Sequence, residues 1–248
     1  VTDGGHHNIG STFTLPILDE WQAINVWDEM EEVKNTMGKC DFSGTTITSN
    51  KPIALFSFHE RTDIPLTSNG RDNLVEQLLP VNMWGKKHIS LQLRCKGATP
   101  KPIAGETLDP DLIVGDYFRV TASEADTKLN VTWWHSITGE LIKELKNQEL
   151  DAEGSYWEWH PDVTNPRKLG VLGVQGIALF ESNKPVQVLQ YCYSTGFGVS
   201  GGNFDPLMVL VPPVEQYGYE TILQTSSYNE MREHYLNLIA EGNASDVV

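Results

Sequence analysis

The most constraining feature of this 248-residue chain is a pair of motifs that each occur twice. Ile47–Leu55 resembles Phe180–Val188, since both contain the tetrapeptide Ser-Asn-Lys-Pro. Pro80–Gly85 resembles Pro213–Gly218, since both read Pro-Val, two further residues, an aromatic ring and Gly. Both pairs are 133 residues apart. Because two separate motifs share one spacing, the sequence predicts a duplicated structural unit.

The duplication continues more weakly outside these motifs. Gly10–Phe13 resembles Gly154–Trp157 and Tyr117–Ala122 resembles Tyr235–Ala240, at spacings of 144 and 118 residues. We therefore expect loops of unequal length, and a chain that begins near the end of one unit and stops inside a third. The expected domains are residues 1–115 (the end of one unit and the start of the first full unit), 116–222 (its remainder and the second copy of the motifs) and 223–248 (the start of a further unit).

Short segments of alternating character predict β-strands throughout the chain. Examples are Ile53–Phe58, His88–Leu93, Tyr117–Ala122 and Lys128–Trp134, while Gly176–Tyr191 predicts two strands around the second Ser-Asn-Lys-Pro turn. The sequence therefore predicts an all-β fold of antiparallel, β-sandwich-like units in tandem repeat, with a propeller-like radial repeat as the alternative. Neighbouring units of the parent protein are then expected partners.

Two segments carry local helix signals. Val26–Met37 has apolar residues at helical spacing and is followed by Gly38, a common helix end. Ser227–Glu230 resembles a capping box and favours a helix over residues 228–241, whereas the match of Tyr235–Ala240 to a strand segment favours a strand. We favour the strand because intrinsic propensity is a weak guide.

The charge excludes two classes of partner. The formal net charge is −15 at pH 7, and an excess of that size repels phosphate backbones and anionic membrane surfaces. The sequence also has no apolar run long enough to insert into a membrane. We therefore expect no nucleic acid partner and no membrane insertion, which leaves proteins and glycans.

Two glycosylation sequons and three cysteines indicate the compartment. The sequons begin at Asn130 and Asn243, and the first lies on the solvent face of a predicted strand. Cys40, Cys95 and Cys192 show no Cys-x-x-Cys spacing. We expect one disulfide and one leftover thiol, with Cys95 paired to Cys192 or Cys40 paired to either. A secreted, extracellular glycoprotein is the favoured interpretation; three buried thiols of a cytosolic protein are the alternative.

Three segments resemble a known family. Phe42–Ser57, Asn73–Gly85 and Asp205–Tyr217 are similar, in order and spacing, to the IgG-Fc-binding-protein N-terminal domain family. Members of that family occur in secreted mucus-associated proteins, in adhesive and matrix proteins and in bacterial surface proteins. The resemblance implies an extracellular interaction role and no reaction.

The chain departs from the family pattern at one place. Family members often carry Cys after the first strand pair and again before the Leu-Val-Glu-Gln segment, where this chain has His59–Arg61 and Arg71–Asn73. The local disulfide is therefore absent, and the loop between these segments must be held in another way. Immunoglobulin binding is not carried over, because it belongs to particular members of the family.

The sequence contains none of the common catalytic or nucleotide-binding motifs, so no catalytic or cofactor-binding residue is predicted. The trio His59–Arg61 is the best acid–base candidate, but adjacent strand residues point to opposite faces, which favours a solvated strand end. Asp109 and Asp111 could supply calcium oxygens, although the loop lacks the ligand pattern of an EF-hand. We therefore assign no metal site and keep calcium as the alternative.

Tryptophans are the remaining candidates. Trp133, Trp134, Trp157 and Trp159 place large rings on both faces of predicted strands, so the outward rings are candidate recognition residues for a protein or glycan. Coverage of these rings by a neighbouring unit is the alternative. The leading hypothesis for function is a non-catalytic adhesion, matrix or mucus-type module. The alternatives are a structural spacer and a glycan-active hydrolase with two carboxylates.

Overall fold

The chain divides into two compact units, Val1–Phe42 and Ser43–Val248, in the computed structural model. The residues that the structure describes are 10–16, 18–19, 22–27, 41–62, 64, 71–93, 99–100, 115–135, 138–159, 176–192, 199–200, 205–225 and 234–240. Those of the first unit form no helix or strand; Asp19 and Gln22 close a turn, with the Gln22 N–H 3.1 Å from the Asp19 carbonyl oxygen.

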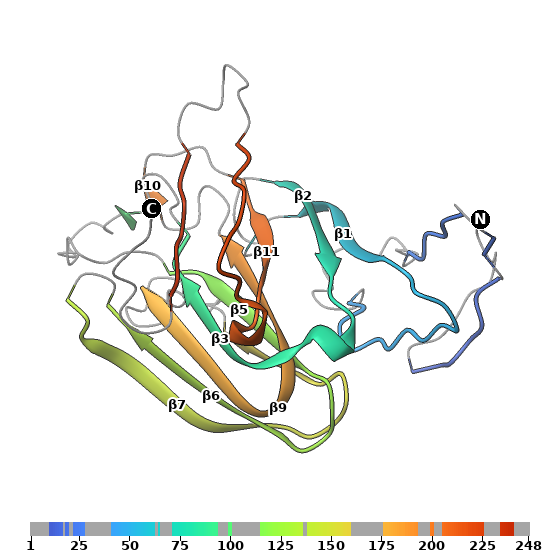
Figure 1. The fold of residues 1–248 in the computed structure, drawn as a ribbon, viewed down its shortest axis with the longest axis horizontal. Coiled ribbons are helices and arrows are strands. Elements are labelled where there is room, and N and C mark those ends of the chain that lie inside the picture. Colours follow the sequence, from blue (N-terminus) through green and yellow to red (C-terminus); the bar gives the residue numbers. More distant parts are fainter. Residues whose placement is uncertain are drawn as a thin grey trace. The chain divides into compact units, whose positions relative to one another are not determined.

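The second unit is built from strands and two short 3-10 helices (Figure 1). In chain order they are β1 (Leu55–Thr62), β2 (Asp72–Leu78), η1 (Val81–Met83), β3 (Gly85–Leu91), β4 (Thr99–Pro100), β5 (Tyr117–Ala122), β6 (Thr127–Trp134), β7 (Leu141–Leu150), β8 (Tyr156–Trp159), β9 (Ile177–Cys192), β10 (Val199–Ser200), β11 (Leu207–Val211) and η2 (Val214–Gln216). Every strand pair is antiparallel, so the predicted all-β, antiparallel class is confirmed.

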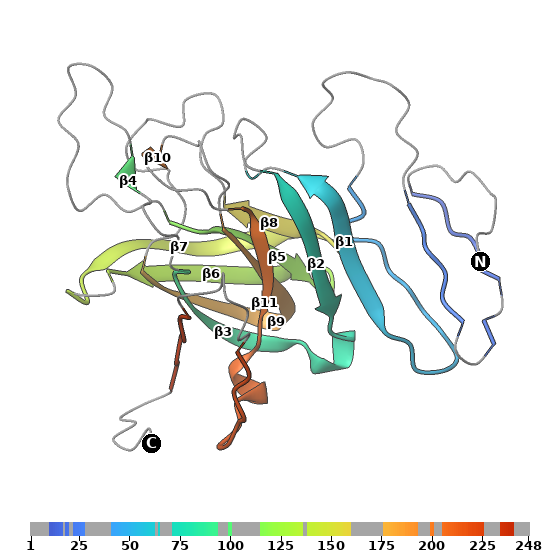
Figure 2. The same cartoon turned by 90° about the horizontal axis from the view of Figure 1, so that it is seen from above.

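The long strand β9 organises the main sheet, whose order is β7-β6-β9-β5-β8 with β3 and β11 also paired to β9. The first half of β9 lies between β6 and β3, and its second half lies between β5 and β11. The sheet curls into a half-barrel, and the predicted tandem repeat of sandwich-like units is not confirmed. Figure 2 shows β1, β2 and β11 crossing the direction of β6 and β7.

The structure corrects the prediction of two strands around the second Ser-Asn-Lys-Pro turn, since these residues lie inside the single strand β9. Pro185 lacks a backbone N–H and is expected only where no ladder hydrogen bond is needed. Its position meets that requirement, because residues 183–185 have no paired partner in either neighbouring strand. The Pro185 carbonyl oxygen accepts from the N–H and the hydroxyl of Ser123, at 3.1 and 2.6 Å.

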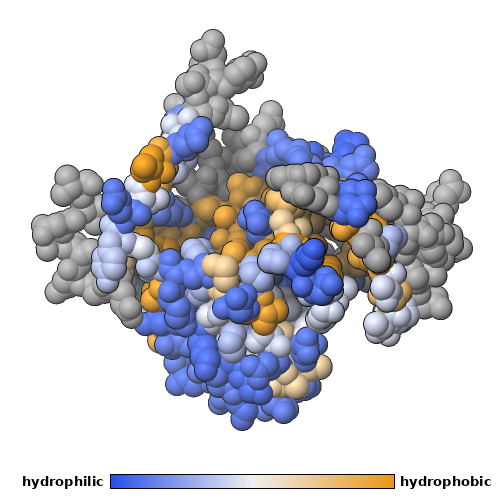
Figure 3. Space-filling model, turned by 45° about the vertical axis from the view of Figure 1, so that its right-hand side comes forward, coloured by the Kyte–Doolittle hydropathy of each residue, from blue (hydrophilic) through white to orange (hydrophobic). Residues whose placement is uncertain are grey.

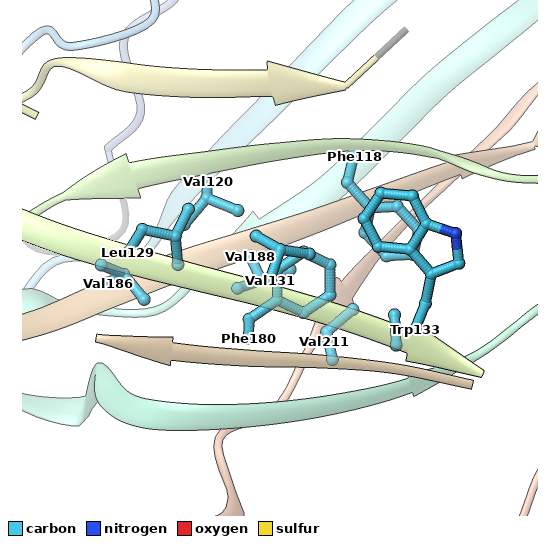
Figure 4. Packing of buried hydrophobic residues seen from close by; sticks show 10 residues of the cluster. Phe118, Val120, Leu129, Val131, Trp133, Phe180, Val186, Val188 and Val211 are labelled. Carbon is cyan, nitrogen blue, oxygen red and sulfur yellow. The ribbon is translucent and has the colours of Figure 1, made fainter. Parts of the chain in front are cut away.

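The core lies on the inner face of the curled sheet (Figure 4). On β6 the buried and solvated positions alternate, as the sequence predicts for a strand with one core face. The cluster consists of Phe118, Val120, Leu129, Val131, Trp133, Ala178, Phe180, Val186, Val188 and Val211. The rings of Phe118 and Phe180 lie 4.9 Å apart at its centre.

Two hairpins, β1–β2 and β9–β11, have the same register 133 residues apart. Leu55 pairs with Leu78 in the first, and Val188 pairs with Val211 in the second. Each hairpin is followed by a 3-10 helix that begins at the valine of a Pro-Val step. In each copy the serine hydroxyl of the Ser-Asn-Lys-Pro motif donates to the lysine carbonyl at 2.6 Å. The second halves of the two motif copies are therefore alike, whereas residues 45–54 form no strand and their counterparts lie in β9.

Other predictions concern boundaries and helices. The predicted division of the chain at residues 115 and 222 stays a prediction; β3 and β9, on the two sides of residue 115, pair in one sheet. Most of the predicted helix Val26–Met37 lies outside the described residues. The described part of segment 228–241, residues 234–240, forms neither a helix nor a strand. No described helix is long and apolar enough to cross a membrane.

Candidate interaction surface

The outward face of hairpin β1–β2 carries three exposed apolar side chains next to one another. Phe58 and Val75 are direct cross-strand partners, and Phe56 lies two residues before Phe58 on the same face. Their exposed fractions are 58% for Phe58, 56% for Val75 and 56% for Phe56. We call these three residues the hairpin face. Figure 3, turned so that the β1–β2 side of Figure 1 comes forward, shows hydrophobic residues gathered in the middle of this view.

The opposite face of the same hairpin is attached to the rest of the unit. Leu74 is buried there, and the Glu76 carboxylate accepts the Leu210 N–H of β11 at 3.3 Å. The hairpin is therefore fixed on its inner side and presents the hairpin face to solvent. Sequence reasoning missed this face, although the alternation in Leu55–Thr62 places both phenylalanines on one side of the strand.

Polar residues surround the hairpin face. Gln77 is the cross-strand partner of Phe56, and Glu60 follows Phe58 at the next position on the same side of β1. An apolar centre with a polar rim is the usual composition of a protein–protein contact. The trio His59–Arg61 lies at this strand end, and all three residues are exposed. The backbone ladder reaches Thr62 and Asp72, which holds the base of the loop that lacks the family's disulfide.

Three of the four predicted recognition tryptophans pack together at the core, namely Trp133, Trp157 and Trp159. Trp133 is 3% exposed and belongs to the core cluster, so its ring is not available to a partner. Trp157 and Trp159 are half-buried and pack against that cluster, with their rings stacked 6.2 Å apart. Lys143 covers the Trp159 ring, with Nζ 4.5 Å from its centroid. Trp134 is half-buried on the other face of β6, and its role in recognition stays a prediction.

A network of charged and aromatic side chains joins β5 to β8 beside these rings. The Arg119 guanidinium forms an ion pair with Glu158 and lies 4.5 Å from the Tyr156 ring centroid. The Tyr117 hydroxyl donates to the same carboxylate at 2.6 Å. Burial, followed by the Glu158 hydrogen bond and charge, raises the pKa of Tyr117 above its usual range. The network is fully paired, which favours a structural role.

Asp116 is the most perturbed carboxyl group that the structure describes. Its Oδ2 accepts the Leu93 N–H at 2.7 Å and the Gln190 amide at 2.6 Å, and the Ser90 hydroxyl donates to Gln190 at 2.7 Å. Burial raises the pKa of Asp116 to about 7, against the lowering effect of these hydrogen bonds. Such a pKa suits a general acid, but the residue is 1% exposed and cannot touch a substrate.

The first sequon residue, Asn130, is exposed on β6, while Leu129 and Val131 on either side are buried. Its side-chain oxygen accepts the Asn147 N–H at 2.9 Å. Asn147 has φ +52° at an irregularity of the β6–β7 pairing. Glycosylation of Asn130 stays a prediction, and Asn243 lies outside the described residues.

Cysteines and metal ligands lie largely outside the described residues. Cys192 is buried at the end of β9 and is disulfide-bonded. Cys40 and Cys95 are not described, so the pairing stays a prediction. Within the described ranges no group of three or more metal-ligating side chains occurs. Asp109 and Asp111 fall outside those ranges, so calcium also stays a prediction.

The comparison with known families covers the entire sequence. Residues 1–248 match the family described as IgGFc binding protein, so the resemblance inferred from three segments is confirmed over the whole chain. No curated protein and no solved structure shows a significant match.

Proposed function

The chain belongs to the IgGFc-binding family, and on this premise we propose that it is a secreted, non-catalytic adhesion module that binds a protein partner through the hairpin face. The family consists of binding domains and is typically extracellular. The observation that carries the proposal is the exposure of Phe56, Phe58 and Val75 on a hairpin whose other side is fixed to the sheet. Burial of such rings stabilises a complex by about 25 cal/mol per Å² of apolar area.

A protein partner fits this face better than a glycan does. Phenylalanine and valine side chains offer no hydrogen-bond donor or acceptor, whereas a glycan presents many hydroxyl groups that need partners. The tryptophan cluster, which would suit a sugar, is half-buried or in the core. The surrounding Glu60 and Gln77 give the rim that a partner's polar groups require.

The proposal is tested with two matched double variants. Phe56→Ser with Phe58→Ser removes both rings of the hairpin face, and Leu141→Ser with Ile142→Ser removes two exposed apolar side chains from β7. Labelled protein is applied to arrays of matrix glycoproteins, mucins and free glycans, and affinities are then measured for each hit. We expect a protein ligand whose affinity falls at least about tenfold in the first variant and is unchanged in the second.

Two outcomes would contradict the proposal. Binding that is unaffected by the first variant would move the site away from the hairpin face. An absence of binding on every array would favour a structural spacer, and turnover of any arrayed glycan would favour the hydrolase alternative.

A further inference from the structure

Two exposed segments of the second unit have strand-forming sequences but no strand partner among the residues that the structure describes. The leading segment is Gly44–Ile53 and the trailing segment is Gly218–Gln224. Both are exposed along their whole length and lie outside the strands. Within the described part of the chain, neither makes a backbone–backbone hydrogen bond. Thr45–Thr48 and Thr221–Leu223 are rich in β-branched residues, which favour strands when a partner is available.

The counterparts of these segments, 133 residues away, pair with each other. The leading segment corresponds to Ile177–Val186, and the trailing segment corresponds to Gly85–Leu91, which is strand β3. In the structure β3 is antiparallel to the first half of β9, with Gly85 opposite Val186 and Leu91 opposite Ile177. β3 and the first half of β9 therefore have each other as strand partners, whereas the leading and trailing segments have no strand partner in the described ranges.

The open leading segment exposes residues that are core residues in its counterpart. Ile47 and Ile53 are 43% and 52% exposed, whereas Phe180 and Val186 at the corresponding positions are both 0% exposed. An added strand would bring these isoleucines the neighbours that their counterparts have, which removes apolar area from water.

A pair of glycines gives a second, independent indication. A Cβ added to Gly85 would lie 2.2 Å from the Pro213 Cβ, so the packing of β3 requires glycine there. A Cβ added to Gly218 would meet only the Glu220 carbonyl oxygen, at 3.8 Å, and the φ of Gly218 is not positive. Nothing in the described part of this chain requires glycine at 218, whereas a neighbour packed as Pro213 packs on Gly85 would require it.

We propose that the trailing segment of one copy of this chain adds as an antiparallel strand to the leading segment of a second copy. The register follows from the β3–β9 pairing: Gly218 opposite Ile53, Glu220 opposite Thr48, Thr221 opposite Ile47, Ile222 opposite Thr46 and Leu223 opposite Thr45. This is strand addition at exposed sheet-forming edges. The two surfaces differ, so the contact is head-to-tail and each added copy leaves a new open segment at each end.

The proposal is tested by blocking one segment at a time with proline. Neighbouring N–H groups on a strand point to opposite edges, so two adjacent prolines remove the donor that faces the partner. The trailing variant is Thr221→Pro with Ile222→Pro, and the leading variant is Ile47→Pro with Thr48→Pro. Matched controls place valine at the same positions. Masses are measured by sedimentation velocity over a range of protein concentrations.

Wild type and both valine controls should grow in mass with concentration beyond the dimer. Each proline variant alone should stay monomeric, and an equimolar mixture of the two should form a one-to-one dimer and nothing larger. Wild type that stays monomeric, a mixture that stays monomeric, or proline variants that associate on their own would each overturn the proposal.

A third variant guards against misfolding of the proline variants. Gly218→Ala meets only the Glu220 carbonyl oxygen in the monomer, at an ordinary contact distance of 3.8 Å, and should fold as wild type does, but it should weaken association by about tenfold because the contact is tight at Gly85. Unchanged association of Gly218→Ala would overturn the register. The hairpin-face variants should leave the mass distribution unchanged, so this proposal and the proposed function stand or fall separately.

Discussion

Hairpins β1–β2 and β9–β11 share a register, a closing 3-10 helix and a serine hydrogen bond, yet their outward faces lie in different surroundings. Phe56 is 56% exposed, whereas Leu189 at the corresponding position is 9% exposed. The second hairpin has β5 beside it, and the first has no strand at that edge within the described residues. The same local pattern therefore yields a covered element or a surface, depending on which strands reach it.

The largest expected difference between the two copies is at Phe180 and Ile47. Phe180→Ala should lower the free energy of unfolding by about 3–5 kcal/mol, because it leaves a cavity beside Phe118 and Trp157. Ile47→Ala should cost less than about 1 kcal/mol in the monomer, since its side chain is exposed. Urea unfolding at low protein concentration measures both. Equal costs would show that Ile47 is already buried in the isolated chain.

A smaller effect on the free energy of unfolding should come from Asp116, which is hydrogen-bonded to Gln190 of the second hairpin. The first hairpin has Ser57 at the position that corresponds to Gln190. Because burial raises the pKa of Asp116 to about 7, the unfolded chain loses the proton of this carboxyl group at a lower pH than the folded chain does. The contribution of the protonated Asp116 to the free energy of unfolding is thus full below about pH 4 and is lost as the pH rises through about 7.

The variant Asp116→Asn keeps an acceptor oxygen for Leu93 and Gln190 and does not titrate. The difference in unfolding free energy between wild type and variant should therefore change by on the order of 3 kcal/mol between pH 4 and pH 8. His88 contributes in the opposite sense, because burial lowers its pKa and its stability contribution is lost as the pH falls below about 6.5. His88 is present in both proteins, so the difference isolates Asp116. A pH-independent difference would contradict the assignment.

The smallest effect concerns how the leading segment is held at its start. A Cβ on Gly154 would lie 2.5 Å from the Gly44 carbonyl oxygen, whereas a Cβ on Gly139 would meet nothing within 4 Å. Both glycines have positive φ, +77° and +69°. Gly139→Ala should therefore cost about 1 kcal/mol for backbone strain, and Gly154→Ala about 2–3 kcal/mol, because a close contact is added. Thermal melting compares the two, and equal shifts would mean that the Gly44 contact is dispensable.

Much of the fold could be predicted from alternation and turn residues. The pattern on Lys128–Trp134 places Leu129 and Trp133 inward and Asn130 outward, and the structure agrees. The chemistry of Ser-Asn-Lys-Pro led to a wrong prediction in the second copy. Its proline is accommodated inside β9 because the strand changes neighbours there, and that exchange is a property of several strands together.

The candidate site was less predictable. Trp133 and Trp159 attract attention by their size, but the strand order brings them together at one end of the core. Phe56 and Phe58 look like ordinary strand residues in the sequence. Their importance depends on the absence of a covering strand, and no local pattern around them reports it.

The family, the antiparallel β class and the likeness of the two motif copies could be predicted from the sequence, because they depend on alternation, turn residues and motif spacing within short stretches of chain, and the shared register of the two strand pairs came from the structure. Tertiary structure alone decided which copy is covered. A strand is buried only when its hydrogen-bonding edges and both of its faces find partners, and those partners come from distant parts of the chain. The strands β5 and β6 supply them to β9, and the leading segment receives no strand partner from the described part of the chain.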